Sequence, residues 1–144
     1  MTKYPTADAV TEIGQKGKSV EIVEARQLVG AANNTKWNKL LNEMRQREDW
    51  RPSYRYKSVG GYVSGWDTEW FYHLPFPFVG VEWFDIGMHQ SVPQGALLDD
   101  RIIDHSTWIL PLLDRIGFEH EWRQDVVRIW GYLPRAYDDF PPTE

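Results

Sequence analysis

Residues 54–86 read YRYKSVGGYVSGWDTEWFYHLPFPFVGVEWFDI, and this aromatic segment decides the fold class. Short β-favouring runs at 54–58, 62–64, 69–74 and 81–86 are separated by Gly, Asp and Pro, the residues that form turns. Four short strands joined by short connections predict an antiparallel, mostly meander sheet. In the last two runs apolar residues fall on both faces, which predicts partial cover on both sides of the sheet.

Helical patterns lie before this segment. An apolar stripe at i, i+3, i+4 and i+7 predicts a helix over about 35–47, and the short polar side chains of residues 33–35 are suited to cap its first turn. An earlier stripe begins at Ser19 and also has helical spacing, with Gly30 near its end. A strand at 19–23 is the alternative for that segment.

The second half of the chain predicts one more helical region and two strands. We expect residues 87–97 to form a loop, and Asp99 or Asp100 to cap a helix that ends at Gly117. Pro111 lies inside this helix, so we expect either a kink or a second helix that begins there. The final strands are expected at about 118–122 and 126–132, with a hinge at Gln124-Asp125.

These elements predict a single α+β domain in which the sheet packs with two to three helices. A chain of 144 residues fits one domain and leaves no room for two full cores. We expect a mobile N-terminal lead-in at 1–18, the domain at 19–133, and an extended acidic tail at 134–144.

The composition points to a cytoplasmic protein. The chain has no cysteine, which excludes disulfides, thiolate zinc ligation and a cysteine nucleophile, and which suits a reducing compartment. Its N-terminus has no apolar run of the kind found in signal peptides, and no stretch approaches the roughly 20 apolar residues of a membrane helix.

Charge is distributed unevenly along the chain, whose net charge is −5. Residues 33–58 carry seven basic and three acidic side chains, whereas residues 66–144 carry five basic and fourteen acidic ones. Overall acidity disfavours nucleic acid, because neutralising phosphates requires Lys and Arg. It suits a basic protein partner, which an acidic surface including Asp99, Asp100 and Asp104 would steer. Simple solubility is the alternative explanation.

One group of residues is suited to catalysis. If the protein is an enzyme, Glu69, His73 and Asp85 are the candidate catalytic residues, because a His beside carboxylates can act as a general base or help to hold a divalent metal. The alternative is that His73 only bonds a neighbour and the acids are solvated. No H-E-x-x-H or comparable run appears and the four His are far apart in sequence, so we expect no metal site and no cofactor.

Other residues are suited to binding. Trp66-Asp67 is expected to turn, and Phe76 and Phe78 lie in a Pro-flanked loop, where they are either interface anchors or a lid over the core. A small ligand stacked on Trp66 or Trp70 would make the protein a sensing module instead.

Five motifs resemble a family of small bacterial proteins with no assigned function. The resemblance spans residues 22–133 and implies no catalytic residues. The motifs are NNTKW (33–37), GYVSGWD (61–67), EWFYH (69–73), VEWFDI (81–86) and RIWGY (128–132).

More loosely, the size, acidity and α+β class are similar to those of immunity proteins, which neutralise bacterial toxins. The sequence therefore favours a non-enzymatic protein-binding module, most concretely an immunity-type inhibitor that occludes a toxin or effector. The alternatives are a metal-dependent or hydrolytic enzyme and a ligand-sensing module.

Overall fold

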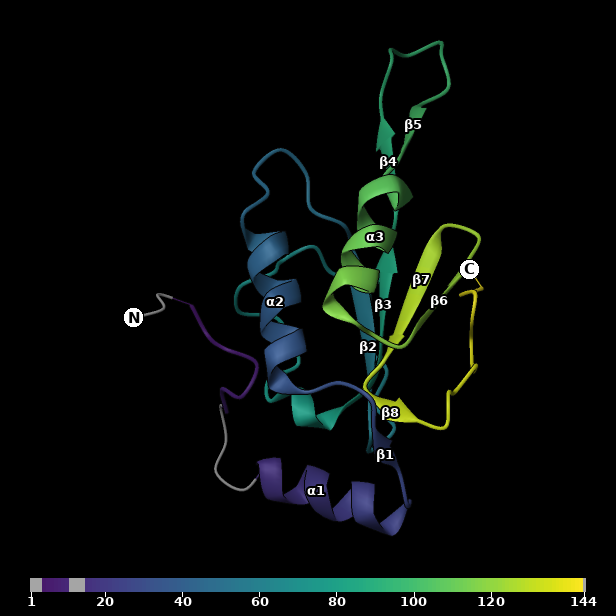
Figure 1. Ribbon diagram of the computed structural model, residues 1–144. Coiled ribbons are helices and arrows are strands. Elements are labelled where there is room, and N and C mark those ends of the chain that lie inside the picture. The colour runs from purple at the N-terminus through teal and green to yellow at the C-terminus, as the bar shows by residue number, and fades with distance from the viewer. Residues whose placement is uncertain (1–3, 11–14, 144) are drawn as a thin grey trace.

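The computed structural model describes residues 4–10 and 15–143, and in these ranges it has an α+β fold (Figure 1). This confirms the predicted fold class. The helices are α1 (Gln15–Ala25), α2 (Asn34–Arg45) and α3 (Ser106–Ile116), with a 3₁₀ turn, η1 (Phe78–Gly80). The strands are β1 (Val29–Gly30), β2 (Tyr54–Ser58), β3 (Val81–Gly87), β4 (His89–Val92), β5 (Arg101–Asp104), β6 (His120–Arg123), β7 (Val126–Trp130) and β8 (Tyr132–Leu133).

The central sheet has the strand order β2-β3-β7-β6, and all its pairs are antiparallel. Strands β2 and β3 are the expected first and last strands of the 54–86 segment. The other two come from the C-terminal hairpin, so the predicted meander of four consecutive strands is wrong. Residues 62–64 contribute only an isolated bridge between Val63 and Lys57.

The segment 69–74 is also not a strand, because its polar and aromatic groups favour a turn. The Glu69 carboxylate accepts hydrogen bonds from the backbone N–H groups of residues 71–73, at 2.7–2.9 Å. These bonds compete with strand pairing. The Trp70 ring is fully buried against Tyr54 and donates to the Pro52 carbonyl, which holds the turn on the core.

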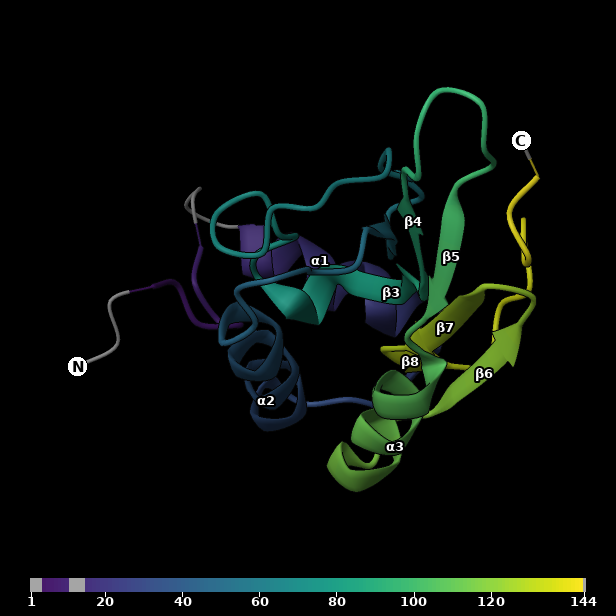
Figure 2. The same ribbon diagram turned by 90° about the horizontal axis from the view of Figure 1, so that it is seen from above.

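The sheet is covered on both faces, as its two-sided apolar pattern predicted. Figure 2 shows α2 and α3 on one side and, on the other, residues 134–143, which we call the C-terminal segment. On the helix side, Tyr54 lies opposite Ile86, and Phe84 lies opposite Ile129, in the main core. On the other side, Trp83 and Trp130 pack with Val126 and Phe140 in a smaller core.

Helix α2 confirms the helix expected over about 35–47. Its apolar stripe is buried, and the Asn33 side chain accepts a hydrogen bond from the Lys36 N–H as the N-cap. Helix α3 starts later than expected, because the Asp104 carboxylate, and not Asp99 or Asp100, accepts from the Ser106 N–H at 2.9 Å. Pro111 lies inside this single helix.

Helix α3 ends where the sequence predicted. Gly117 has a φ of 92°, a left-handed conformation that glycine adopts without strain, and its N–H donates to the Leu113 carbonyl. The following hairpin, β6–β7, confirms the two expected strands, and Gln124 provides its turn with a φ of 55°.

The two ends of the described chain pack against the body. Helix α1 begins at Gln15 and ends at Ala25, earlier than the stripe from Ser19 indicated, and β1 then pairs with β8. Ala7, within the expected lead-in, is fully buried, and its N–H donates to the Asn38 side chain at 2.7 Å. Phe140, within the expected tail, is also buried. Residues 1–3, 11–14 and 144 lie outside the described residues.

The expected loop at 87–97 is wrong in its first half, because Gly87 ends β3 and His89–Val92 form β4, whereas residues 93–97 lie outside the strands. Strand β4 continues β3 beyond the central sheet and pairs with β5, from His89–Asp104 to Val92–Arg101. This two-stranded hairpin, residues 89–104, projects from the body next to the N-terminus of α3 (Figure 1). We call it the arm.

Candidate functional site

The three candidate catalytic residues do not converge. His73 lies on the loop after β2, where its Nδ1 is 2.9 Å from Asp67 Oδ2, and Glu69 accepts hydrogen bonds from its own turn. Asp85 lies on β3, on the face opposite Phe84 and the main core, and it is fully buried. The structure therefore provides no common site for these residues.

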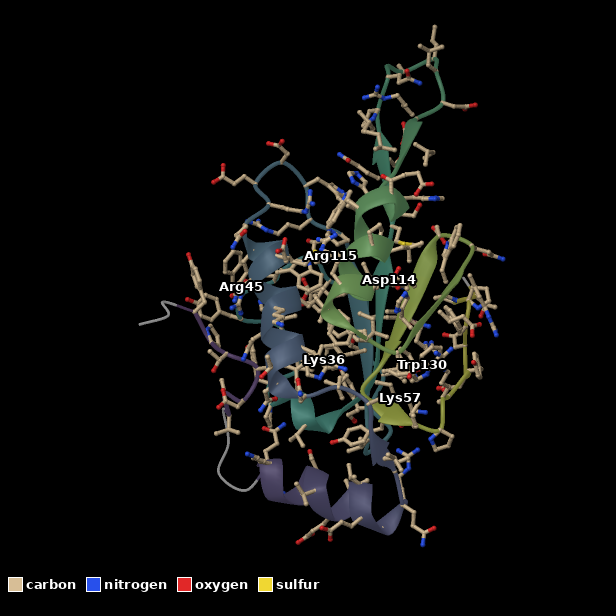
Figure 3. All side chains as sticks on the ribbon, viewed as in Figure 1. Lys36, Arg45, Lys57, Asp114, Arg115 and Trp130 are labelled. Carbon is tan, nitrogen blue, oxygen red and sulfur yellow. The ribbon has the colours of Figure 1, made fainter. Side chains whose placement is uncertain are left out.

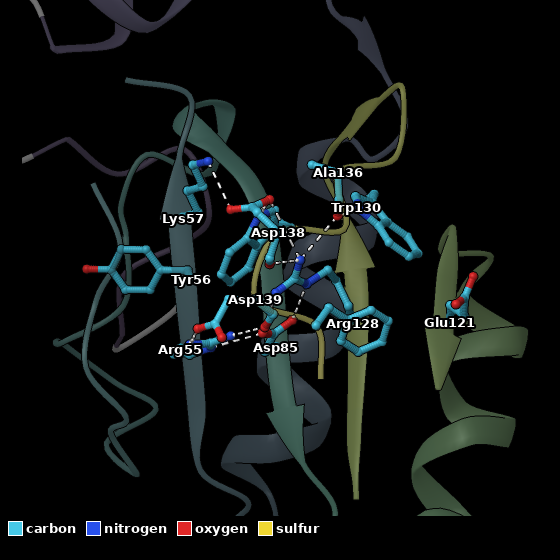
Figure 4. Close-up of polar contacts among 12 residues, drawn as sticks. Arg55, Tyr56, Lys57, Asp85, Glu121, Arg128, Trp130, Ala136, Asp138 and Asp139 are labelled. Atoms are coloured by element: carbon cyan, nitrogen blue, oxygen red, sulfur yellow. Dashed lines mark hydrogen bonds and ion pairs between the residues drawn. The ribbon is translucent and has the colours of Figure 1, made fainter. Parts of the chain in front are cut away.

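Asp85 instead bridges two arginines from neighbouring strands (Figure 4). Arg128 of β7 contacts it twice, through Nε at 2.7 Å and Nη2 at 3.0 Å, and Arg55 of β2 contacts it through Nε at 3.0 Å. Burial raises the pKa of the Asp85 carboxyl, although both guanidinium groups act in the opposite direction. We call Arg55, Asp85 and Arg128 the charge cluster.

The C-terminal segment seals the charge cluster from water. Arg128 lies 3.6 Å from the centre of the Trp83 ring and donates to the carbonyls of Ala136 and Asp138, at 3.1 and 2.7 Å. Arg55 forms an ion pair with Asp139 at 2.8 Å. All members are satisfied and closed in, so the cluster holds the C-terminal segment on the sheet and offers no open catalytic group.

The predicted aromatic anchors divide into buried and exposed groups. Phe76 and Phe78 are 8% and 1% exposed and belong to the main core, so they form a lid and not an interface. Trp70 is fully buried, which rules out a ligand stacked on its ring. Trp66 is 44% exposed, and Asp67 lies beside it in the bridge to Tyr54.

The three predicted acidic binding residues all lie on or beside the arm, and all three are exposed. Asp100 Oδ2 accepts a hydrogen bond from Ser91 Oγ at 2.7 Å, and the Asp99 carbonyl accepts from Gln94 Nε2 at 2.9 Å. Asp104 lies at the base of the arm, where the bonds from Ser106 lower the pKa of its carboxyl. The arm thus presents negative charge to solvent.

The arm also exposes apolar side chains that the sequence reading missed. Leu97 is 98% exposed, Leu98 is 64% exposed and Ile102 is 56% exposed. Figure 3 shows the side chains of the arm extending away from the body with no other element beside them, whereas those of α2 and α3 meet the sheet. Two adjacent leucines at the tip of a projecting hairpin contribute little to the core, and they make the tip a candidate interaction site.

A cluster of aromatic and polar groups fixes the base of the arm. The Trp50 ring stacks on His105 at 4.0 Å between ring centres, and the Arg47 guanidinium lies 3.2 Å from the centre of the Trp108 ring. Together with Glu48, Asp49 and Gln90, these residues line a cleft of about 410 Å³.

His105 connects both sides of this cluster as a neutral imidazole. Trp108 Nε1 donates to His105 Nδ1 at 2.7 Å, and an indole nitrogen is a donor only, so Nδ1 carries no proton. The other nitrogen, Nε2, therefore donates to the Gln90 side-chain oxygen at 2.8 Å. Burial, followed by the charge of Arg47, lowers the pKa of His105, in agreement with this assignment.

Among residues 4–10 and 15–143, no group of three or more His, Asp or Glu side chains is arranged to hold a metal ion. In the same part of the chain, no helix has the length and apolar character needed to cross a membrane.

A family model described as "Family of unknown function (DUF6678)" matches residues 19–136. Comparisons with curated proteins and with solved structures found no match.

Proposed function

The chain belongs to this family of unknown function, DUF6678, and from that premise we propose that it is a non-enzymatic protein-binding module whose arm contacts a basic partner. The most concrete form of the proposal is an immunity-type inhibitor that occludes a toxin or effector. The observation that carries it is the projecting arm, on which Leu97 and Leu98 lie exposed beside Asp99 and Asp100.

The shape of the arm supports insertion into a concave site. A two-stranded hairpin presents its tip side chains at a distance from the body, and the leucines at this tip have little intramolecular packing to lose. A few side chains that fill well-packed, desolvated pockets at the centre of an interface contribute most of its binding free energy. Leu97 and Leu98 are therefore the proposed anchors.

Charge supports the choice of a basic partner. The residues of the arm include Asp99, Asp100 and Asp104 against a single arginine, Arg101. Acidic groups around an apolar tip accelerate association with a basic site and weaken contacts with acidic proteins. Inhibition by occlusion needs only this complementary surface, and it involves no turnover.

The test begins with affinity purification of the tagged protein from its native host. A co-purified protein is then purified separately, and binding is measured by titration calorimetry. We expect one-to-one binding that weakens as salt is raised, because about 0.1 M salt screens charges beyond roughly 10 Å. If the recovered protein is a toxin or another effector, its activity should fall in proportion to the complex formed.

The matched variants are L97D/L98D and V29D. Val29 is 62% exposed on β1, at the end of the molecule opposite the arm, so it controls for placing an acid on an exposed apolar position. We expect L97D/L98D to weaken binding at least about thirtyfold and V29D to have little effect. Equal binding by both variants would remove the arm from the proposal, and recovery of no stoichiometric protein partner would overturn the function.

A further inference from the structure

The cleft at the base of the arm is lined by groups that contact one another. Its volume of about 410 Å³ lies in the range of roughly 300–1,000 Å³ that is typical of small-molecule sites. The Arg47 guanidinium covers the Trp108 ring, and the Trp108 indole donates to His105. The His105 ring also stacks on Trp50 and donates to Gln90. Because each group touches the next, they form one continuous wall.

Three segments of the chain meet at this cleft, so its shape depends on the folded state. The loop after α2 contributes residues 47–50, β4 contributes Gln90, and the start of α3 contributes the other two side chains. Arg51 holds the loop in place, because its guanidinium donates to the carbonyls of Met44 and Arg45, at 3.0 and 3.1 Å.

Arg47 carries a positive charge that has no counter-ion in the described part of the chain. Its neighbours Arg45 and Arg51 donate to backbone carbonyls, whereas the half-buried Arg47 Nε is closed off from water and has no acceptor there. A donor removed from water without a partner is costly, so Arg47 favours an acceptor that comes from outside the protein.

The Gln90 amide adds a second donor to the cleft. Because His105 Nε2 donates to the Gln90 side-chain oxygen, the orientation of the amide is fixed, and its NH₂ group is left to donate elsewhere. Both Gln90 and Arg47 line the cleft. A carboxylate suits this pair of donors, since a guanidinium binds carboxylates through two parallel N–H bonds.

Glu48 and Asp49 supply the opposite charge. Both line the cleft, both are exposed, and neither forms an ion pair among residues 4–10 and 15–143. The cleft therefore presents unpaired groups of both signs. A ligand with one charge is attracted by one part of this surface and repelled by the other, whereas a zwitterion is matched by both.

We propose that this cleft binds a free amino acid with an apolar side chain. Its carboxylate accepts hydrogen bonds from Arg47 and Gln90, and its ammonium group pairs with the two carboxylates that line the cleft. Its side chain packs against the indole rings of Trp50 and Trp108, which are both half-buried. The site is separate from Leu97 and Leu98, so it does not depend on the partner proposed for the arm.

The test is an NMR titration of the full chain with L-phenylalanine and with L-leucine. Two analogues each remove one charge: L-phenylalaninamide has no carboxylate, and N-acetyl-L-phenylalanine has no ammonium group. We expect at least one of the two amino acids to give saturable shifts of the Trp50 and Trp108 indole N–H signals. Each analogue should bind at least about tenfold more weakly than phenylalanine, because it loses one charged interaction.

Two variants assign the two ends of the ligand. R47Q should remove the preference for phenylalanine over its amide, and E48Q/D49N should remove the preference over the acetyl derivative. A general loss of structure would not change the selectivity for one end alone. Since Glu48 and Asp49 are exposed, the second variant still tests the site if R47Q fails to fold. R101Q is the matched control, because Arg101 is exposed on the arm and lies outside the cleft.

Three results would overturn the assignment of this site. The first is the absence of a saturable shift with both amino acids, and the second is binding of either analogue as tightly as phenylalanine. The third is a selectivity that stays unchanged in both R47Q and E48Q/D49N. The L97D/L98D variant should bind the amino acid as the wild type does, so a failure of this site is distinguishable from a failure of the arm.

Discussion

At the scale of single residues, Asp85 supplies buried counter-charge to two guanidinium groups that the fold has removed from water. Arg128 is fully buried and the Arg55 side chain is 7% exposed, so neither can turn to solvent if its partner is lost. Removing one member of a buried ion-paired group costs more than the pair contributes, because it leaves uncompensated charge. The charge cluster therefore makes the smaller core sensitive to single substitutions.

The isosteric substitution D85N tests this dependence. We expect it to lower the free energy of unfolding by about 3–5 kcal/mol, because Arg128 loses the carboxylate that it contacts twice and Arg55 keeps only Asp139, while the side-chain volume stays the same. Urea denaturation followed by tryptophan fluorescence measures the change. D99N, at an exposed position of the arm, should stay within about 0.5 kcal/mol of the wild type. A loss below about 1 kcal/mol in D85N would contradict the role given to the cluster.

His105 should make the stability of the protein depend on pH. The pKa of His105 in the folded protein lies below its ordinary value of 6.5, so in the window between the two values the unfolded chain binds more protons. The stabilisation is complete above pH 6.5 and is lost as the pH falls through the folded pKa. NMR titration of the His105 ring should give a pKa below 6.5. In R47Q, which removes a nearby positive charge, that pKa should rise.

At the scale of elements, the arm and the body should be separable. The tip residues of the arm are exposed and the His105 contacts hold only its base. Replacing residues 93–100 with Asn-Gly would join β4 and β5 by a two-residue turn that suits a hairpin. We expect the free energy of unfolding to change by less than about 1 kcal/mol, because no core contact is removed.

The same variant should lose partner binding, which calorimetry with the recovered protein would detect. Its circular dichroism spectrum should match that of the wild type, and its thermal unfolding should remain cooperative. Loss of the fold in this variant would show that the arm supports the body, contrary to the exposure of its tip.

The elements of the fold also differ in how far the sequence predicts them. Helix α2 was predictable because its buried stripe and the Asn33 cap are both local signals. Strands β2, β3, β6 and β7 were predictable from β-favouring runs and turns. The segment 69–74 was not, because β-favouring aromatic residues there serve as core anchors of a turn that the Glu69 carboxylate organises.

The arm could not be predicted from periodicity, because its strands have no buried face to impose alternation. For a similar reason, the sequence pointed to some candidate site residues and not to others. Asp99, Asp100 and Asp104 were proposed from charge, whereas Leu97 and Leu98 fell between the expected loop at 87–97 and the expected helix cap, where no pattern singled them out. Phe76 and Phe78 lie in a loop that folds back over the core, and a single sequence does not reveal such a long-range contact.

At the scale of the whole molecule, the sheet separates two cores of unequal size. The smaller core depends on the C-terminal segment, through the buried Phe140 ring and the carbonyls that accept from Arg128. The described body is therefore a layered structure that is complete only when this segment is in place.

Deleting residues 136–144 tests this dependence. The deletion exposes Trp83 and Trp130 and removes partners from both arginines of the charge cluster. We expect the free energy of unfolding to fall by more than about 3 kcal/mol. The shorter deletion of residues 142–144 leaves Phe140 in place and should cost less than about 1 kcal/mol. Similar stabilities of the two truncated proteins would contradict the two-core description.

The separation between arm and body has an evolutionary consequence. Substitutions at the tip of the arm are free of the packing constraints that restrict the two cores, so they can accumulate without unfolding the protein. Relatives that share this body can then diverge in what they recognise by altering one hairpin. Within the family, we expect the fastest sequence divergence, and the greatest length variation, between His89 and Asp104.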